Sequence, residues 1–240
     1  MAEAVKAGRR QEDLVRAKLF PSKQDLRVSL RGRWRALLES TAAPWSLASQ
    51  CFSELSERYE QPGRYYHTFA HVYFMLEQFE ILRHLSHLPR PLEFAIWFHD
   101  CFQDPYSFWN KERSAEAAAA WMSSFGIPSI EIDATQKLIQ LTRSHEPKSG
   151  DIDEWIMSDL DLSVLGASED YYEWYRSSVR EEYPEVPERL YNAVRAFWIR
   201  RLLRRQKIYL TTPMSRLREA SARANLTEEL GSLNPRAQAG

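Results

Sequence analysis

The chain has 240 residues, 44% hydrophobic and 27% charged, a balance that is typical of a globular protein and excludes a disordered or fibrous one. Its formal net charge of -1 excludes a globally basic nucleic-acid binder, although a local basic face is still compatible with it. Cys51 and Cys101 are too few and too far apart for the disulfide framework of a small secreted domain. We therefore expect reduced thiols in an intracellular, cytoplasmic protein.

The length allows one substantial hydrophobic core. We predict a single domain over 31–231, preceded by a partly flexible N-terminal arm at 1–30 and followed by a flexible tail at 232–240. Residues 1–16 carry repeated charges and no apolar run, so we expect neither a signal peptide nor a membrane span there. The 8 glycines are too few for a many-turned β protein and favour long helices.

Hydrophobic periodicity predicts an all-α fold, a single-domain helical bundle without strands or internal repeats. Apolar residues recur at helical spacing over 34–59, where Pro44 begins a second helix, and again over 66–85. Residues 92–102 are apolar almost throughout, which predicts a helix buried on all sides. Further helices are predicted at 110–125, 129–145, 168–183, 186–207 and 214–230, with Gly126 as a terminator and prolines between the helices.

Histidines and their neighbours carry the evidence for chemistry. His67 and His71 are four residues apart in a predicted helix, so both imidazoles are expected to point into one cleft. His99 and Asp100 interrupt the apolar helix, where their burial is costly unless a metal ion or a full set of hydrogen bonds compensates. Alone, a His-Asp dipeptide is more often a chance pair with satisfied hydrogen bonds. Imidazole and carboxylate ligands together suit a divalent cation rather than a cysteine-bound structural zinc.

Five short motifs follow one another along the chain: 66–71 (YHTFAH), 95–100 (AIWFHD), 110–115 (NKERSA), 141–145 (LTRSH) and 158–166 (SDLDLSVLG). Their order and spacing resemble those of a predicted metal-dependent phosphohydrolase subgroup in the HD-domain superfamily. The resemblance continues through 180–183, 208–209 and 222–226, so it covers residues 34–230. Several spaced motifs in order are far more specific than one dipeptide.

In that superfamily the metal takes one histidine from an early helix, a consecutive histidine and aspartate, and an aspartate from a later helix. The resemblance therefore implies a divalent ion (Mn, Mg, Zn, Fe, Co or Ni) bound by His71, His99, Asp100 and Asp161. Asp159 is the competing distal ligand, and Asp161 is preferred because 161–166 fits the subgroup's pattern better. His145 matches a position that in some relatives holds a second metal or phosphate, so one metal or two stays open.

The first motif is also similar to the cyclic-nucleotide phosphodiesterases, in which the first histidine protonates the leaving oxygen; this implies His67 as the general acid. The subgroup commonly has acidic residues directly after the asparagine of the third motif, whereas this chain has a lysine there, which leaves Glu112 as the candidate catalytic carboxylate. Candidates for substrate phosphate binding are Arg64, Lys111, Arg113 and Arg180, although any single one is more commonly an ordinary surface charge.

The resemblance thus implies hydrolysis of a phosphate mono- or diester by metal-activated water, and we expect a nucleotide or similar small molecule as substrate. The alternative is a non-catalytic metal-binding module that recruits an RNA or protein partner through the basic run at 195–207, which more often forms a solvated helix face. A di-iron oxygenase has less support, because a second iron needs further ligands and His145 is the one additional candidate that the sequence offers. No membrane partner is expected, and the oligomeric state is open.

Overall fold

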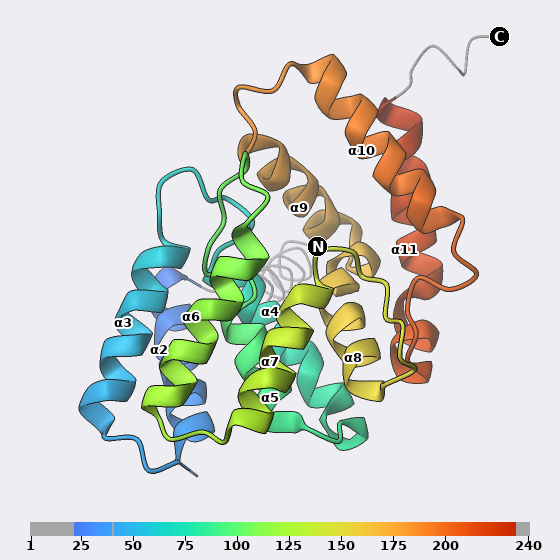
Figure 1. Ribbon diagram of the computed structural model, residues 1–240. Coiled ribbons are helices and arrows are strands. Elements are labelled where there is room, and N and C mark those ends of the chain that lie inside the picture. The colour runs from blue at the N-terminus through green and yellow to red at the C-terminus, as the bar shows by residue number, and fades with distance from the viewer. Residues whose placement is uncertain (1–21, 40, 234–240) are drawn as a thin grey trace, which may run out of the picture.

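The computed structural model describes residues 22–39 and 41–233, and this part of the chain is all-helical, as the sequence predicts. It contains ten α-helices and two short 3-10 helices (Figure 1). In chain order these are α2 (Lys23–Leu38), α3 (Trp45–Tyr59), α4 (Phe69–Leu82), η1 (Arg83–Leu85), α5 (Pro89–Phe98), α6 (Asn110–Ser124), α7 (Ser129–Leu141), α8 (Ile152–Asp161), η2 (Leu162–Gly166), α9 (Glu169–Glu181), α10 (Glu188–Leu203) and α11 (Thr212–Leu233).

Helix α5 is buried over 91–98, as its apolar sequence predicts, but it ends at Phe98, so residues 99–102 lie after the predicted helix and not within it. The indole of Trp34 on α2 packs edge-on against α5, with ring centroids 5.2 Å from Trp97 and 6.0 Å from Phe94. Its Nε1 donates a hydrogen bond of 2.9 Å to the carbonyl oxygen of Ala48 on α3. One side chain therefore ties three helices together and satisfies its own polar atom.

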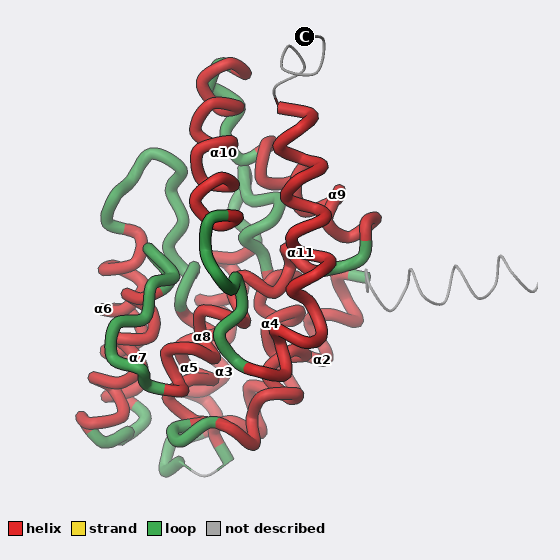
Figure 2. The backbone as a smooth tube through the Cα atoms, turned by 90° about the vertical axis from the view of Figure 1, so that its right-hand side faces the viewer, coloured by secondary structure: helices red, strands yellow, loops and turns green. Residues whose placement is uncertain are grey.

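The C-terminal helices α10 and α11 lie on the side of the molecule away from α6 and α7 (Figures 1 and 2). Arg195 on α10 is buried and pairs with Glu229 on α11 through two contacts of 2.8 and 3.1 Å. It also donates to the hydroxyl of Tyr175 on α9 at 2.9 Å. Because a buried guanidinium is costly unless it is fully paired, this contact fixes the three helices relative to one another.

Helix ends follow the prolines and glycines of the sequence. Pro44, Pro128 and Pro187 immediately precede α3, α7 and α10, where a missing N–H costs nothing. Gly126 ends α6 with φ +72°, a left-handed conformation that glycine adopts readily. Within residues 22–39 and 41–233, no helix has both the length and the apolar composition to cross a membrane.

The folded domain begins earlier than the predicted boundary at residue 31. Leu26 and Leu30 on α2 are buried in the core, so residues 23–30 belong to the domain and not to an arm. At the other end, α11 continues to Leu233, past the predicted limit at 231. The rest of the predicted arm and tail, 1–21 and 234–240, lies outside the described residues.

Helix α4 begins at Phe69, and this corrects the predicted position of His67. Thr68 caps the helix with an extended backbone, and its Oγ1 accepts a hydrogen bond from the backbone N–H of Ala70. His67 therefore lies in the turn before the helix, so the placement of both histidines on one helical face is wrong. The two imidazole centroids are nevertheless 6.1 Å apart, because the turn folds back towards His71.

Candidate metal centre

Four side chains that are distant in the sequence converge inside the helical bundle. His71 lies in the first turn of α4, His99 and Asp100 follow the end of α5, and Asp161 is the last residue of α8. His71 Nε2 is 3.1 Å from both His99 Nε2 and Asp161 Oδ1, and His99 Nε2 is 3.0 Å from Asp100 Oδ2. One ligand atom from each of the four residues lies within 4.8 Å of the others. These are the four ligands that the sequence motifs implied.

Hydrogen bonds on the outer nitrogens orient both imidazoles. His99 Nδ1 is 2.9 Å from the carbonyl oxygen of Ile96, which can only accept, so Nδ1 carries a proton and Nε2 is the nitrogen that faces the cluster. His71 Nδ1 is 2.9 Å from the hydroxyl oxygen of the buried Tyr66. Histidines that bind metal ions are commonly held in this way through their second nitrogen.

Neighbouring groups keep both carboxylates ionised in spite of their burial. Burial acts to raise the pKa of Asp100, but His99 and Lys111 hold it well below its ordinary value. Burial is likewise outweighed at Asp161, where hydrogen bonds from two histidines hold the pKa well below the usual range. Burial lowers the pKa of His71, which favours the neutral imidazole. Ionised carboxylates and neutral imidazoles are the forms that bind a metal ion.

The donor set fits a divalent cation. Two imidazole nitrogens and two carboxylate oxygens face one point, and these acceptor atoms repel one another unless a cation or a proton lies between them. Such mixed nitrogen and oxygen ligands suit Zn, Mn, Fe, Co and Ni, whereas Mg prefers oxygen alone. The cluster can therefore hold a metal ion whose identity stays open.

His145 extends the cluster beyond Asp161. Its Nε2 is 2.8 Å from Asp161 Oδ2, while Asp161 Oδ1 faces His71, so the carboxylate presents one oxygen to each histidine. His145 lies in the turn after α7 with φ +52°, a left-handed backbone conformation that is uncommon for residues other than glycine. Strained backbone of this kind tends to occur where a side chain is held for function.

Glu182, to which the sequence had assigned no role, holds His67 beside the cluster. Its Oε2 is 2.5 Å from His67 Nδ1, and its Oε1 accepts hydrogen bonds of 2.8–2.9 Å from the backbone N–H groups of Tyr65, Tyr66 and His67. His67 Nε2 then lies 3.9 Å from Asp100 Oδ2. Burial lowers the pKa of His67, but the Glu182 carboxylate raises it above its ordinary value. His67 is therefore favoured in its protonated form.

The third sequence motif contributes Lys111 rather than Glu112 to the cluster. Lys111 Nζ is 2.6 Å from Asp100 Oδ1 and 3.4 Å from the carbonyl oxygen of His99. Glu112 instead forms an ion pair with Arg143. The lysine that departs from the subgroup's pattern thus supplies a positive charge to the ligand carboxylate.

The predicted phosphate-binding arginines make contacts within the protein. Arg64 is buried and donates to the carbonyl oxygens of His67, Asp100 and Cys101 at 3.1, 2.6 and 3.0 Å. It therefore fixes the backbone that carries the site instead of facing a ligand. The other two pack against neighbours, Arg113 over the ring of Phe102 and Arg180 on the carbonyl oxygens of Tyr183 and Val186.

Asp159, the competing distal ligand, has a different set of partners. Its carboxylate accepts hydrogen bonds from the backbone N–H of Leu210 (2.7 Å) and from the N–H and hydroxyl of Thr211 (2.8 and 2.7 Å). Burial raises its pKa to about 7. Asp159 therefore fastens α8 to the segment before α11, while Asp161 reaches the cluster.

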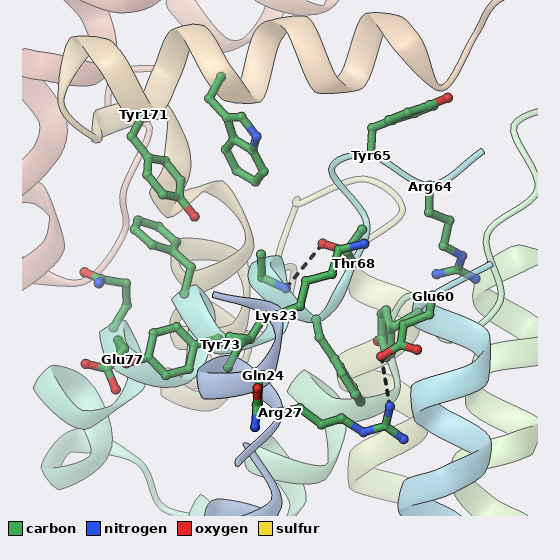
Figure 3. Close-up of a pocket in the computed structure, with 17 residues that line it drawn as sticks. Lys23, Gln24, Arg27, Glu60, Arg64, Tyr65, Thr68, Tyr73, Glu77 and Tyr171 are labelled. Carbon is green, nitrogen blue, oxygen red and sulfur yellow. Dashed lines mark hydrogen bonds and ion pairs between the residues drawn. The ribbon is translucent and has the colours of Figure 1, made fainter. Parts of the chain in front are cut away.

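Two large cavities surround this region. One, of about 910 Å³, is lined by His67, Asp100, Lys111, His145 and Asp161 together with an apolar wall. The other, of about 1150 Å³, lies between α2, α4 and α9, where Arg27 pairs with Glu60 (Figure 3). None of the described residues that line this second cavity is a histidine or an aspartate. We therefore place the candidate site in the smaller cavity.

Comparison with protein-family models, with curated proteins and with solved structures gives no match for this chain. Its functional assignment therefore depends on the motifs of the sequence and on the geometry of the cluster. Membership of the HD-domain superfamily is a proposal on those two grounds.

Proposed function

We propose that this protein is an HD-type, metal-dependent hydrolase of phosphate esters. One observation carries the proposal: four ligand atoms converge within 4.8 Å of one another, and two of their residues, Asp100 and Asp161, line a cavity together with the carboxylate-bound His67. A purely structural metal site needs the four ligands but neither the cavity nor the extra histidine. A hydrolase needs all three.

In this proposal the four residues of the cluster bind the metal ion, and Lys111 acts beside them. His71, His99, Asp100 and Asp161 would hold a divalent ion, which would activate water and supply positive charge for the phosphoryl oxygens. Lys111, with its Nζ 2.6 Å from Asp100 Oδ1, lines the same cavity and offsets the charge of that carboxylate. The repulsion between Asp100 and an anionic substrate is thereby reduced.

His67 is the proposed proton donor. Its Nδ1 is held by Glu182, so Nε2 is the nitrogen that faces the cavity. In the protonated state, which Glu182 stabilises, Nε2–H can pass its proton to the leaving alkoxide oxygen as the P–O bond breaks. Glu182 then orients the neutral ring in the correct tautomer for reprotonation from solvent.

The rival function, recruitment of RNA or protein by the basic run at 195–207, gains little from the contacts. Arg195 is buried against Glu229, and Arg201 pairs with Glu146 at 2.5 Å. Arg205 donates to the carbonyl oxygen of Ser144. Three of the six basic side chains in this run are thus paired within the chain, which favours a phosphate ester as the partner.

The test is hydrolysis of p-nitrophenyl phosphate and bis(p-nitrophenyl) phosphate by chelator-treated protein that is reloaded with each candidate metal in turn. We expect turnover that requires added metal and falls by at least about 100-fold in His99→Ala. His84→Ala is the matched control, because His84 is an exposed histidine in η1, and its activity should stay within about twofold. Absence of turnover with every metal and both esters would contradict the proposal.

A further inference from the structure

The cavity beside the cluster has an extended apolar wall. On α10 the wall consists of Leu190, Tyr191, Val194 and Trp198, which are spaced so that they share one face of the helix. Val179 on α9 and Leu165 in η2 continue the wall towards the body of the protein. A wall of this size removes a large apolar surface of a ligand from water.

Positive charge is scarce in the same cavity. Of the lysines and arginines that the structure describes, Lys111 and Arg195 line it. Lys111 is paired with Asp100, and Arg195 is bound through two contacts to Glu229. A nucleoside di- or triphosphate needs further cations for its additional phosphates, and neither side chain is free to provide them.

The rim of the cavity is apolar on two sides. Phe108, in the loop before α6, is 89% exposed, and Leu190 and Val194 on α10 are 56% and 62% exposed. Large apolar side chains that gather around an opening usually mark a binding site. An apolar ligand that extends from the cluster along α10 would cover them.

We propose that the substrate is a monoester of a single phosphoryl group with a long, predominantly apolar alcohol. This inference rests on the proposed function and names its substrate class. The phosphoryl group lies at the cluster and the apolar chain lies against α10. Water attacks phosphorus, the P–O bond to the alcohol breaks, and the proton of His67 goes to the alcohol oxygen; the products are the free apolar alcohol and inorganic phosphate.

Binding can be measured without turnover by calorimetry with methyl-, hexyl- and decylphosphonate, whose P–C bond resists hydrolysis, on full-length protein supplied with Mn²⁺. We expect the affinity to rise by about two- to fourfold per methylene from methyl to hexyl. Leu190→Asp should remove most of this rise. Leu217→Asp on α11 is the matched control, because Leu217 is also 56% exposed and does not line the cavity. An affinity that does not depend on chain length overturns the inference.

Kinetics separate this inference from the proposed function. Leu190→Asp should raise the KM for decyl phosphate by at least about 10-fold, whereas the control Leu217→Asp should leave it within about twofold. A preference for nucleoside monophosphates over decyl phosphate would overturn the substrate class and leave the hydrolase intact. If the affinity for phosphonates rises with chain length but no ester is hydrolysed, the apolar ligand is supported and the proposed hydrolase function is contradicted.

Discussion

The imidazole of His67 depends on a residue 115 positions later in the chain. Glu182 uses one carboxylate oxygen to fix the backbone of the turn and the other to bind Nδ1. The position of the ring and its proton affinity therefore have the same origin. This arrangement separates the two histidines of the first motif by role, since His71 faces the ligand cluster while His67 faces the cavity.

Replacement of His67 by alanine should test its role as proton donor. We expect His67→Ala to keep its metal and to lose about two orders of magnitude or more in turnover of an alkyl phosphate. Activated aryl esters should lose less, because their leaving oxygen needs little protonation. Both ester types are assayed at equal metal occupancy; an equal loss on both would argue against proton donation, and loss of metal would make His67 a ligand.

Glu182→Gln should shift the pH dependence of turnover. Glutamine can still accept the three backbone hydrogen bonds through Oε1, but it removes the charge that raises the pKa of His67. Activity that requires protonated His67 is present below the pKa of His67 and is lost above it. Lowering that pKa should therefore move the alkaline limb of the pH–rate profile to lower pH. An unchanged limb would show that another group controls it.

Helix α8 performs two tasks at its C-terminal end. Successive residues of a helix are rotated by about 100°, so Asp159 and Asp161 point to nearly opposite sides. Asp161 reaches the candidate metal cluster, whereas Asp159 binds the chain at Leu210 and Thr211. The end of α8 therefore joins the site to the C-terminal helices.

Asp159→Ala should destabilise the protein without removing its metal. Three hydrogen bonds are lost and two backbone N–H groups lose their partners, which should lower the free energy of unfolding by about 2–4 kcal/mol in urea titrations. The pKa of Asp159 is about 7 in the fold against 3.8 unfolded, so the stability that it contributes falls as pH rises across that window. The difference between wild type and variant should thus be larger at pH 5 than at pH 8.

Metal analysis of the same variant and of Asp161→Ala completes this test. Asp161→Ala should lose the metal that Asp159→Ala retains, because only Asp161 contributes an atom to the cluster. The reverse result would exchange the two assignments.

At the scale of the whole molecule, the sequence predicts what depends on local pattern. The apolar periodicity and the prolines are enough to predict the all-α class and most of the helices. The order of the motifs is enough to predict that His71, His99, Asp100 and Asp161 lie together. The start of α4 was missed because a threonine cap overrides an apolar pattern that continues through it. Partners such as Glu182 were missed because only tertiary packing brings them near.

Tertiary packing also determines which arginines are buried and paired and which are exposed. Arg64 and Arg195 resemble surface charges, yet each is buried and satisfied by partners from distant segments. No local feature distinguishes them from Arg200, which is exposed. The sequence therefore predicts the members of the candidate metal cluster better than the residues that support them.

The metal content of protein purified without chelator tests the central claim most directly. We predict roughly one divalent ion or more per wild-type chain and less than about a tenth of that in His99→Ala and Asp100→Ala, since each removes a ligand and leaves its neighbours uncompensated. His84→Ala, an exposed histidine outside the cluster, should match wild type. Equal metal content in wild type and in both ligand variants would contradict the claim that this cluster is the metal site.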